Sequence, residues 1–180
     1  MKKNILIFGL IAGLIASSML IAMTITCYTT NKFEGNMLLG YTFMLIAFSF
    51  VFVGVKNYRD QFNGGVISLG KAFKIGAIIA LIASTVYVLV WLICYYLFMP
   101  DFMERFTANF VEELKAKGTS AVKIKEEMAS MDFYKDMYKT PFGVILLTYM
   151  EILPVGLVIS FVVALILRRN LPKFSANATT

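Results

Sequence analysis

The chain has 180 residues, of which 59% are hydrophobic and 16% are charged, and its formal net charge is +6. Soluble domains have about 45–50% apolar and about 25% charged residues, so this composition argues against a soluble protein and favours an integral membrane protein. Because the chain has no histidine and only two cysteines, it lacks the commonest general base and metal ligand and cannot form a four-cysteine site. We therefore expect no bound metal and no cofactor.

Four long apolar runs predict four membrane-spanning helices, at about residues 5–26, 37–55, 72–98 and 142–167. The first run follows a basic start, as a secretory signal does, but the apolar region of a signal has only about 7–15 residues. We interpret it as a retained helix, with a cleaved signal as the alternative. The prediction is an all-α polytopic membrane protein with a single domain over residues 1–170, followed by a short disordered cytoplasmic tail at 171–180.

A polar segment, 56–71, separates the second apolar run from the third and is predicted to be a loop. Asn63, Gly64 and Gly65 are typical of a tight turn, because both residue types tolerate positive φ. Ser68 is placed to cap the third helix by accepting a backbone N–H.

Residues 100–140 form the only long polar segment, and their spacing predicts two amphipathic helices joined near Gly118. Phe102, Phe106 and Phe110 recur every four residues, and Ser120 offers a cap for the second helix. The apolar face of this insert could bind a lipid, an apolar ligand or a partner. We favour the simpler interpretation that it lies on the bilayer surface or caps the helix bundle.

The two predicted membrane faces carry unequal charge. One face holds the N-terminal start, the 56–74 region and the C-terminal end, with nine basic residues and one acidic residue. The insert on the other face has seven basic and eight acidic residues. The positive-inside rule therefore predicts an inner (cytoplasmic) membrane protein with both termini cytoplasmic and residues 100–140 periplasmic. We interpret the net charge as this orientation signal and not as a nucleic-acid-binding surface.

Small residues recur at helical spacing within the predicted spans, which lets helix backbones approach closely in lipid. The residues that we expect to pack helices together are Gly9, Gly13, Ala72, Gly76, Ala80, Gly156 and Ser160. On a straight helix Gly156 and Ser160 point away from Glu151, so the last span either bends or contacts partners on two sides. The partners would be the lipid bilayer and a second copy of the chain or other membrane proteins.

Glu151 is the first candidate for a functional residue, because it lies roughly 14 Å into the last span, near the middle of a core about 30 Å thick. A charge at that depth is expensive, and Pro154 interrupts the helical hydrogen bonds one turn later. A carboxyl beside a kink is typical of an ion or proton site. The alternative is a protonated, structural glutamate that shares hydrogen bonds with hydroxyl groups at similar depth, namely Ser17, Ser18, Ser84 and Thr85.

Two other features have a functional and a simpler interpretation. The basic residues of the 56–74 region could hold a phosphate or an anionic lipid headgroup, or they could only fix the orientation of the chain. These residues are Lys56, Arg59, Lys71 and Lys74. Cys27 and Cys94 could form a disulfide in an oxidising compartment, although two free thiols are the simpler prediction.

Several short motifs resemble those of one known family. They are Gly54-Val-Lys-Asn-Tyr-Arg-Asp60, Gly64-Gly65 with Ile67-Ser68, Gly70-Lys-Ala-Phe73 followed by Gly76, Tyr87, Trp91 with Tyr95-Tyr96, and Glu151-Ile-Leu-Pro-Val-Gly156. On these motifs the chain resembles domain-of-unknown-function family 4199 (DUF4199), small inner-membrane proteins found mainly in Bacteroidota, over about residues 5–170. Leu69 departs from the aromatic residue expected there. The resemblance implies four membrane helices with a periplasmic insert, and it implies no activity.

Three functions are consistent with these features. The leading hypothesis is a non-catalytic structural or accessory membrane subunit, because no acids, bases and nucleophiles converge in the sequence. The alternative is a small transporter or channel component that uses Glu151, which would need a polar track reaching that carboxyl from one side. A membrane enzyme is the third and weakest hypothesis.

Overall fold

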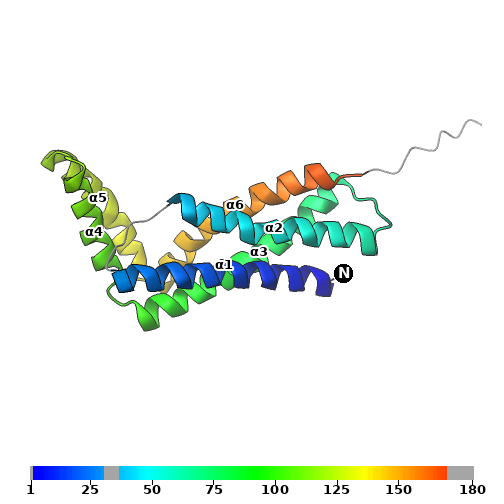
Figure 1. The fold of residues 1–180 in the computed structure, drawn as a ribbon, viewed down its shortest axis with the longest axis horizontal. Helices are drawn as coiled ribbons and strands as arrows, with labels where there is room; N and C mark the ends of the chain where they lie inside the picture. Colours follow the sequence, from blue (N-terminus) through cyan, green and yellow to red (C-terminus); the bar gives the residue numbers. More distant parts are fainter. Residues whose placement is uncertain (1, 31–36, 170–180) are drawn as a thin grey trace, which may run out of the picture.

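A computed structural model describes residues 2–30 and 37–169, which are almost entirely helical. The elements are α1 (Lys2–Thr30), α2 (Met37–Phe62), α3 (Leu69–Ile93), the π-helical turn η1 (Cys94–Phe98), α4 (Phe102–Ala116), α5 (Ala121–Tyr138) and α6 (Pro141–Leu167). The long helices α1, α2, α3 and α6 form a bundle, and the α4–α5 hairpin crosses one end of it (Figure 1). The predicted tail at 171–180 and most of the polar link between the first two spans lie outside the described residues.

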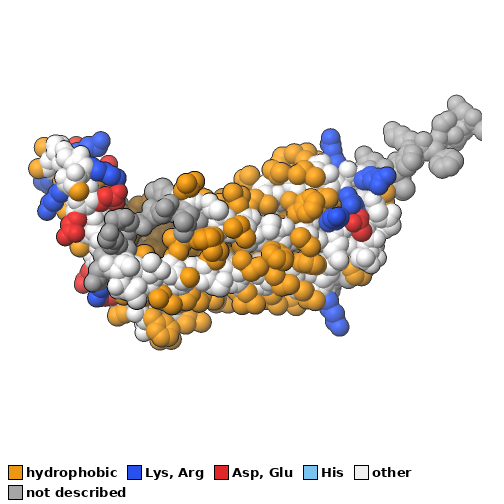
Figure 2. All heavy atoms as spheres, in the orientation of Figure 1, with side chains coloured by type: hydrophobic (Ala, Val, Ile, Leu, Met, Phe, Trp, Pro, Cys, Tyr) orange, Lys and Arg blue, Asp and Glu red, His pale blue; other side chains and the backbone are white. Residues whose placement is uncertain are grey.

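The four bundle helices are long and apolar enough to cross a membrane. This confirms the predicted all-α membrane fold with four spans and a helical insert between the third and fourth. Figure 2 shows a broad apolar belt between two charged ends. We call the end with the α2–α3 loop and Arg168 the basic end, and the end with α4 and α5 the insert end.

The 56–71 segment is less of a loop than predicted, because α2 continues to Phe62 and α3 begins at Leu69. The polar residues after Val55 stay helical because one side of that last stretch is buried, with Tyr58 only 3% exposed. The turn itself is formed as predicted, with positive φ at Gly64 and Gly65. Ser68 occupies the N-cap position of α3, but its side chain makes no capping hydrogen bond, which corrects that prediction.

A short backbone pairing closes the basic end. Ile67, which follows the turn, exchanges two hydrogen bonds with Arg169, which follows α6: its N–H donates to the Arg169 carbonyl at 3.0 Å and the reverse bond is 2.9 Å. The Ile67 side chain is buried. This pairing holds the α2–α3 turn against the end of α6.

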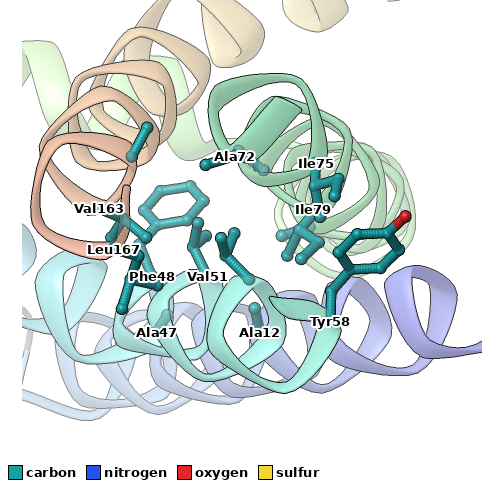
Figure 3. Close-up of a cluster of buried hydrophobic side chains, with 14 of the residues drawn as sticks. Ala12, Ala47, Phe48, Val51, Tyr58, Ala72, Ile75, Ile79, Val163 and Leu167 are labelled. Atoms are coloured by element: carbon teal, nitrogen blue, oxygen red, sulfur yellow. The ribbon is translucent and has the colours of Figure 1, made fainter. Parts of the chain in front are cut away.

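Close helix contacts fill the bundle from the basic end to its middle. A Cβ atom added at Gly9 would lie 2.7 Å from Ile82, and one added at Gly76 would lie 3.0 Å from Ser160. A Cβ at Gly156 would lie 2.8 Å from the Phe48 ring, which is 1% exposed. Figure 3 shows Phe48 and Val51 of α2 pointing between α3 and α6. The other small residues predicted to pack helices also lie in this region: Gly13 against α3, with Ala72, Ala80 and Ser160 buried.

The insert folds as two helices joined at Gly118, whose φ of +71° requires glycine there. Ser120 caps α5 as predicted, by accepting the Lys123 N–H. The turn from α5 into α6 is tight, because Thr140 caps Gly143 and a Cβ at Gly143 would lie 2.0 Å from the Met137 carbonyl oxygen. α6 then continues through Pro154 to Leu167.

Candidate functional site

A cavity of about 400 Å³ opens into the bundle near the insert end, in contrast to the packed basic half. Residues of α1, α2, α3, α4, α5 and α6 all line it, so it is the place where the insert meets the four spans. Figure 2 shows the molecule hollowed near the insert end on this face. Most of the wall is apolar, with a few hydroxyl groups and one carboxyl. We call it the insert-end cavity.

The α1 and α2 side of the cavity is built from flexible and small side chains. Met19, Met23 and Thr24 of α1 face it together with Gly40 and Phe43 of α2. A Cβ atom added at Gly40 would meet no heavy atom of the described residues within 4 Å, so this wall leaves space beside Gly40. Methionine side chains adapt to irregular shapes, which suits a site that accepts apolar molecules of different shapes.

The side of the cavity formed by α3, α4 and α5 is aromatic. The Trp91 ring meets Phe102 edge-on at 5.1 Å between centroids, and Phe102 stacks on Phe106 at 5.8 Å. Tyr138, at the end of α5, packs against Tyr95 at 5.2 Å. Burial raises the pKa of Tyr138 to about 12, although a hydrogen bond from Trp91 opposes the rise, so this phenol stays protonated at neutral pH. These contacts connect α3, η1, α4 and α5 at the insert end.

Glu151 lies on α6 and lines the cavity with Thr148 and Tyr87. Glu151 is exposed in the structure, whereas Thr148 and Tyr87 are buried, with exposed fractions of 4% and 8%. Within residues 2–30 and 37–169, its carboxyl makes no hydrogen bond and no ion pair. An acidic group thus lines a largely apolar space, and no basic residue is among the described residues of that lining.

In the described structure, none of the hydroxyl groups predicted to share hydrogen bonds with Glu151 makes such a bond. Ser18 donates to the Ile15 carbonyl at 2.8 Å, and Thr85 pairs with the Tyr149 hydroxyl at 2.8 Å. The Ser17 and Ser84 hydroxyls are buried without a hydrogen-bond partner in the described part of the chain. Depth along the helices was the basis of the prediction, and none of these four residues is among the described residues that line the cavity with Glu151. Pro154 lies on the exposed side of α6.

A small polar cluster joins the rim of the cavity to the insert. The Tyr28 hydroxyl donates to the Asp101 carboxylate at 2.9 Å, and Arg105 donates to the same carboxylate at 2.6 Å. The Arg105 guanidinium also lies over the Tyr28 ring, 5.1 Å from its centroid. The hydrogen bonds from Arg105 and then Tyr28 hold the pKa of Asp101 below its ordinary value. This cluster connects the end of α1 to the start of α4.

The second candidate, the basic region of the α2–α3 loop, is partly occupied by its own contacts. Arg59 pairs with Asp60 at 2.7 Å. Lys71 donates to Asn63 at 2.6 Å and lies over the Tyr58 ring at 5.3 Å. The remaining members, Lys56 and Lys74, are exposed.

Metal and thiol chemistry receive no positive support from the geometry. In the described residues, no group of three histidine, cysteine or acidic side chains is placed to hold a metal ion. Cys27 and Cys94 are both free, and Cys27 lines the insert-end cavity.

The aromatic wall is the part of the site that the sequence did not predict. A tryptophan near the end of a span is typical of the membrane–water boundary, and Phe102 and Phe106 belong to the predicted amphipathic face of the insert, so each has an adequate separate explanation. The signal available was that large rings gather at the end of α3 and again at the start of the insert, two stretches that adjoin in the chain.

The match to known families agrees with the motifs. The family model described as "Protein of unknown function (DUF4199)" matches residues 7–169, which is most of the chain. No curated protein and no solved structure matches the chain. The chain therefore belongs to the family described as Protein of unknown function (DUF4199).

Proposed function

We propose that this protein is a non-catalytic accessory protein of the inner membrane that binds a small, mainly apolar molecule in the insert-end cavity. Both termini lie in the cytoplasm and the insert lies in the periplasm. The excess of basic residues at the basic end supports this orientation, because cytoplasmic loops are enriched in lysine and arginine. Its exposed apolar faces contact the lipid bilayer and bind a second copy of the chain or other membrane proteins.

The observation that carries the proposal is the cavity itself. Ligand sites are typically concave spaces of about 300–1,000 Å³ with apolar walls and a few polar groups. The insert-end cavity, at about 400 Å³, has this size and this lining. The adaptable methionines on one side and the aromatic rings on another favour a ligand defined by shape and apolar surface.

The single tryptophan of the chain makes the proposal testable, because Trp91 lines the cavity. The protein in maltoside micelles is titrated with 1-octanol, a neutral apolar probe, and Trp91 emission is recorded. We expect a saturable change in the wild-type protein. Gly40→Leu should abolish it, because the added side chain enters open space in the cavity.

Gly70→Leu is the matched control. It adds the same side chain to a helix at the basic end, also in open space and outside the cavity. We expect it to bind octanol as the wild type does. A linear, non-saturating response in the wild type, or equal responses of Gly40→Leu and the wild type, would overturn the proposal.

The orientation is tested by labelling cysteines placed at the two ends in a chain that lacks Cys27 and Cys94. Lys117 and Gln61 are both exposed, the first between α4 and α5 and the second near the end of α2. In spheroplasts, a membrane-impermeant maleimide should label Lys117→Cys at once and Gln61→Cys only after permeabilisation. The reverse pattern would place the insert in the cytoplasm.

The position of Glu151 favours one second candidate, a small transporter component that carries its ligand past this carboxyl. Transport would require the packed basic half to open, since Phe48 and Ile79 fill it in this structure. Uptake of a substrate into proteoliposomes that is lost in Glu151→Gln, with binding in the cavity retained, would favour transport over an accessory role.

A further inference from the structure

We propose that the insert-end cavity selects a cation, specifically an ammonium group attached to an apolar body. This inference rests on the proposed function and adds the chemical class of the ligand. Among the described residues that line the cavity, Glu151 is the only acidic one and none is basic. The charge of the described lining is therefore complementary to a single positive group.

The aromatic wall supplies the second part of the recognition. Tyr87, Trp91 and Tyr138 line the cavity together with Glu151, and Phe102 and Phe106 close it from the insert. The negative face of an aromatic ring attracts an ammonium ion within about 6 Å, and sets of rings are a known means of holding alkylated ammonium groups. The same attraction occurs at the rim, where the Arg105 guanidinium lies over the Tyr28 ring.

The position of the Glu151 carboxyl in the cavity also favours a cationic ligand. A low-dielectric space favours the protonated form of a carboxyl, and a cation bound beside it would stabilise the ionised form. Within the described residues no lysine or arginine pairs with Glu151, so a bound cation would provide the missing partner. A neutral molecule would offer no such stabilisation, and an anion would be repelled by the ionised carboxyl.

Two sources could supply this chemistry. One is a free alkylammonium compound that enters from the periplasm, and the other is the ammonium headgroup of a membrane lipid. A lipid headgroup carries a phosphate next to its ammonium, and the described lining offers no base for that phosphate.

The test compares hexyltrimethylammonium with 1-octanol in maltoside micelles, which contain no ammonium group, with Trp91 emission as the readout. Glu151→Gln keeps the shape of the side chain and removes its charge. We expect this variant to bind the cation at least about tenfold more weakly and to bind octanol within about twofold of the wild type. Phe106→Leu keeps the apolar bulk without the ring and should weaken only the cation, by about threefold.

Glu126→Gln is the matched control, because Glu126 is an exposed carboxyl of α5 outside the cavity. If it weakens the cation as much as Glu151→Gln does, the general charge of the insert attracts the cation and the inference is wrong. If octanol binds but Glu151→Gln leaves the cation unaffected, the inference fails and the proposed function stands. If neither probe binds, both fail.

Addition of phosphatidylethanolamine to the micelles separates the two sources. A lower apparent affinity for hexyltrimethylammonium would identify the lipid headgroup as a competing occupant of the same site. An unchanged affinity would identify the free cation as the ligand. Both results support recognition of an ammonium group, provided that the effect of Glu151→Gln is seen.

Discussion

The two halves of the bundle are built from the same four helices, but one half is closely packed and the other contains a cavity. In the basic half, glycine, alanine and serine bring the backbones together, and a Cβ atom at Gly156 would lie 2.8 Å from the Phe48 ring. In the insert half, Gly40 has open space around it and large rings replace the small residues. Side-chain volume at the contacts therefore determines where the bundle closes and where it leaves room for a ligand.

The difference also separates stability from binding. Without a hydrophobic driving force between helices in lipid, association depends on close packing and interhelical hydrogen bonds. The tightly packed half supplies that contact, so the other half can keep a cavity, and a carboxyl that has no partner among the described residues, without unfolding the bundle. Substitutions in the two halves should accordingly affect different measurements.

Removal of a large ring gives the largest expected effect on stability. Phe48 and Phe43 lie on the same helix, but Phe48 is buried against α6 whereas Phe43 is half-buried at the cavity wall. Phe48→Ala should lower the free energy of unfolding by about 3–5 kcal/mol because it leaves a hole in a close-packed region. Phe43→Ala should lower it by about 1 kcal/mol because it only enlarges an existing space. Chemical denaturation in micelles measures both, and equal losses would contradict the comparison.

A single methyl group at a glycine should give a smaller effect of opposite sign in the two halves. Gly156→Ala should destabilise by about 1–3 kcal/mol, since the new Cβ would lie 2.9 Å from the Cβ of Ala80, which a helix backbone holds in place. Gly40→Ala should be neutral or stabilise by up to about 1 kcal/mol, because alanine favours helix and the space is open. Thermal unfolding of the two variants provides the measurement. Destabilisation by Gly40→Ala would mean that the insert half is packed after all.

The features that could be predicted from the sequence are those that depend on local residue patterns. Apolar runs gave the four spans, Gly118 and Ser120 gave the division of the insert, and the motifs around Gly54 and Glu151 gave the family. These features follow from residue spacing or from positions that require a particular residue.

The errors arose where tertiary packing decides the outcome. α2 continues past Val55 because the Tyr58 side chain is buried, which the number of charged residues in this segment does not indicate. The cavity depends on which side chains fail to meet between helices that are distant in the chain. Glu151 is predicted from its depth, but the presence of Tyr87 and Trp91 in the same cavity depends on the relative rotation of α3 and α6, which one sequence does not specify.

The smallest expected effect is a pH dependence at the rim of the cavity. Because hydrogen bonds from Arg105 and Tyr28 lower the pKa of Asp101, the folded protein binds this proton less readily than the unfolded chain, whose aspartates have a pKa of about 3.9. The contact therefore stabilises the insert above that value and is lost as the pH falls through the lower folded pKa. Trp91 emission reports the loss, because Phe102, next to Asp101, packs on Trp91.

Asp101→Asn should remove this acid transition and show the altered Trp91 signal already at neutral pH. The change should be small, since both Asp101 and Arg105 are partly exposed and water screens their pairing. Asp136→Asn is the matched control, because Asp136 pairs with Lys139 at 2.7 Å near the same end but outside the cavity. If Asp136→Asn removes the transition equally, or if Asp101→Asn retains it, the insert is held by apolar contacts alone and the insert half depends on ring packing for its shape.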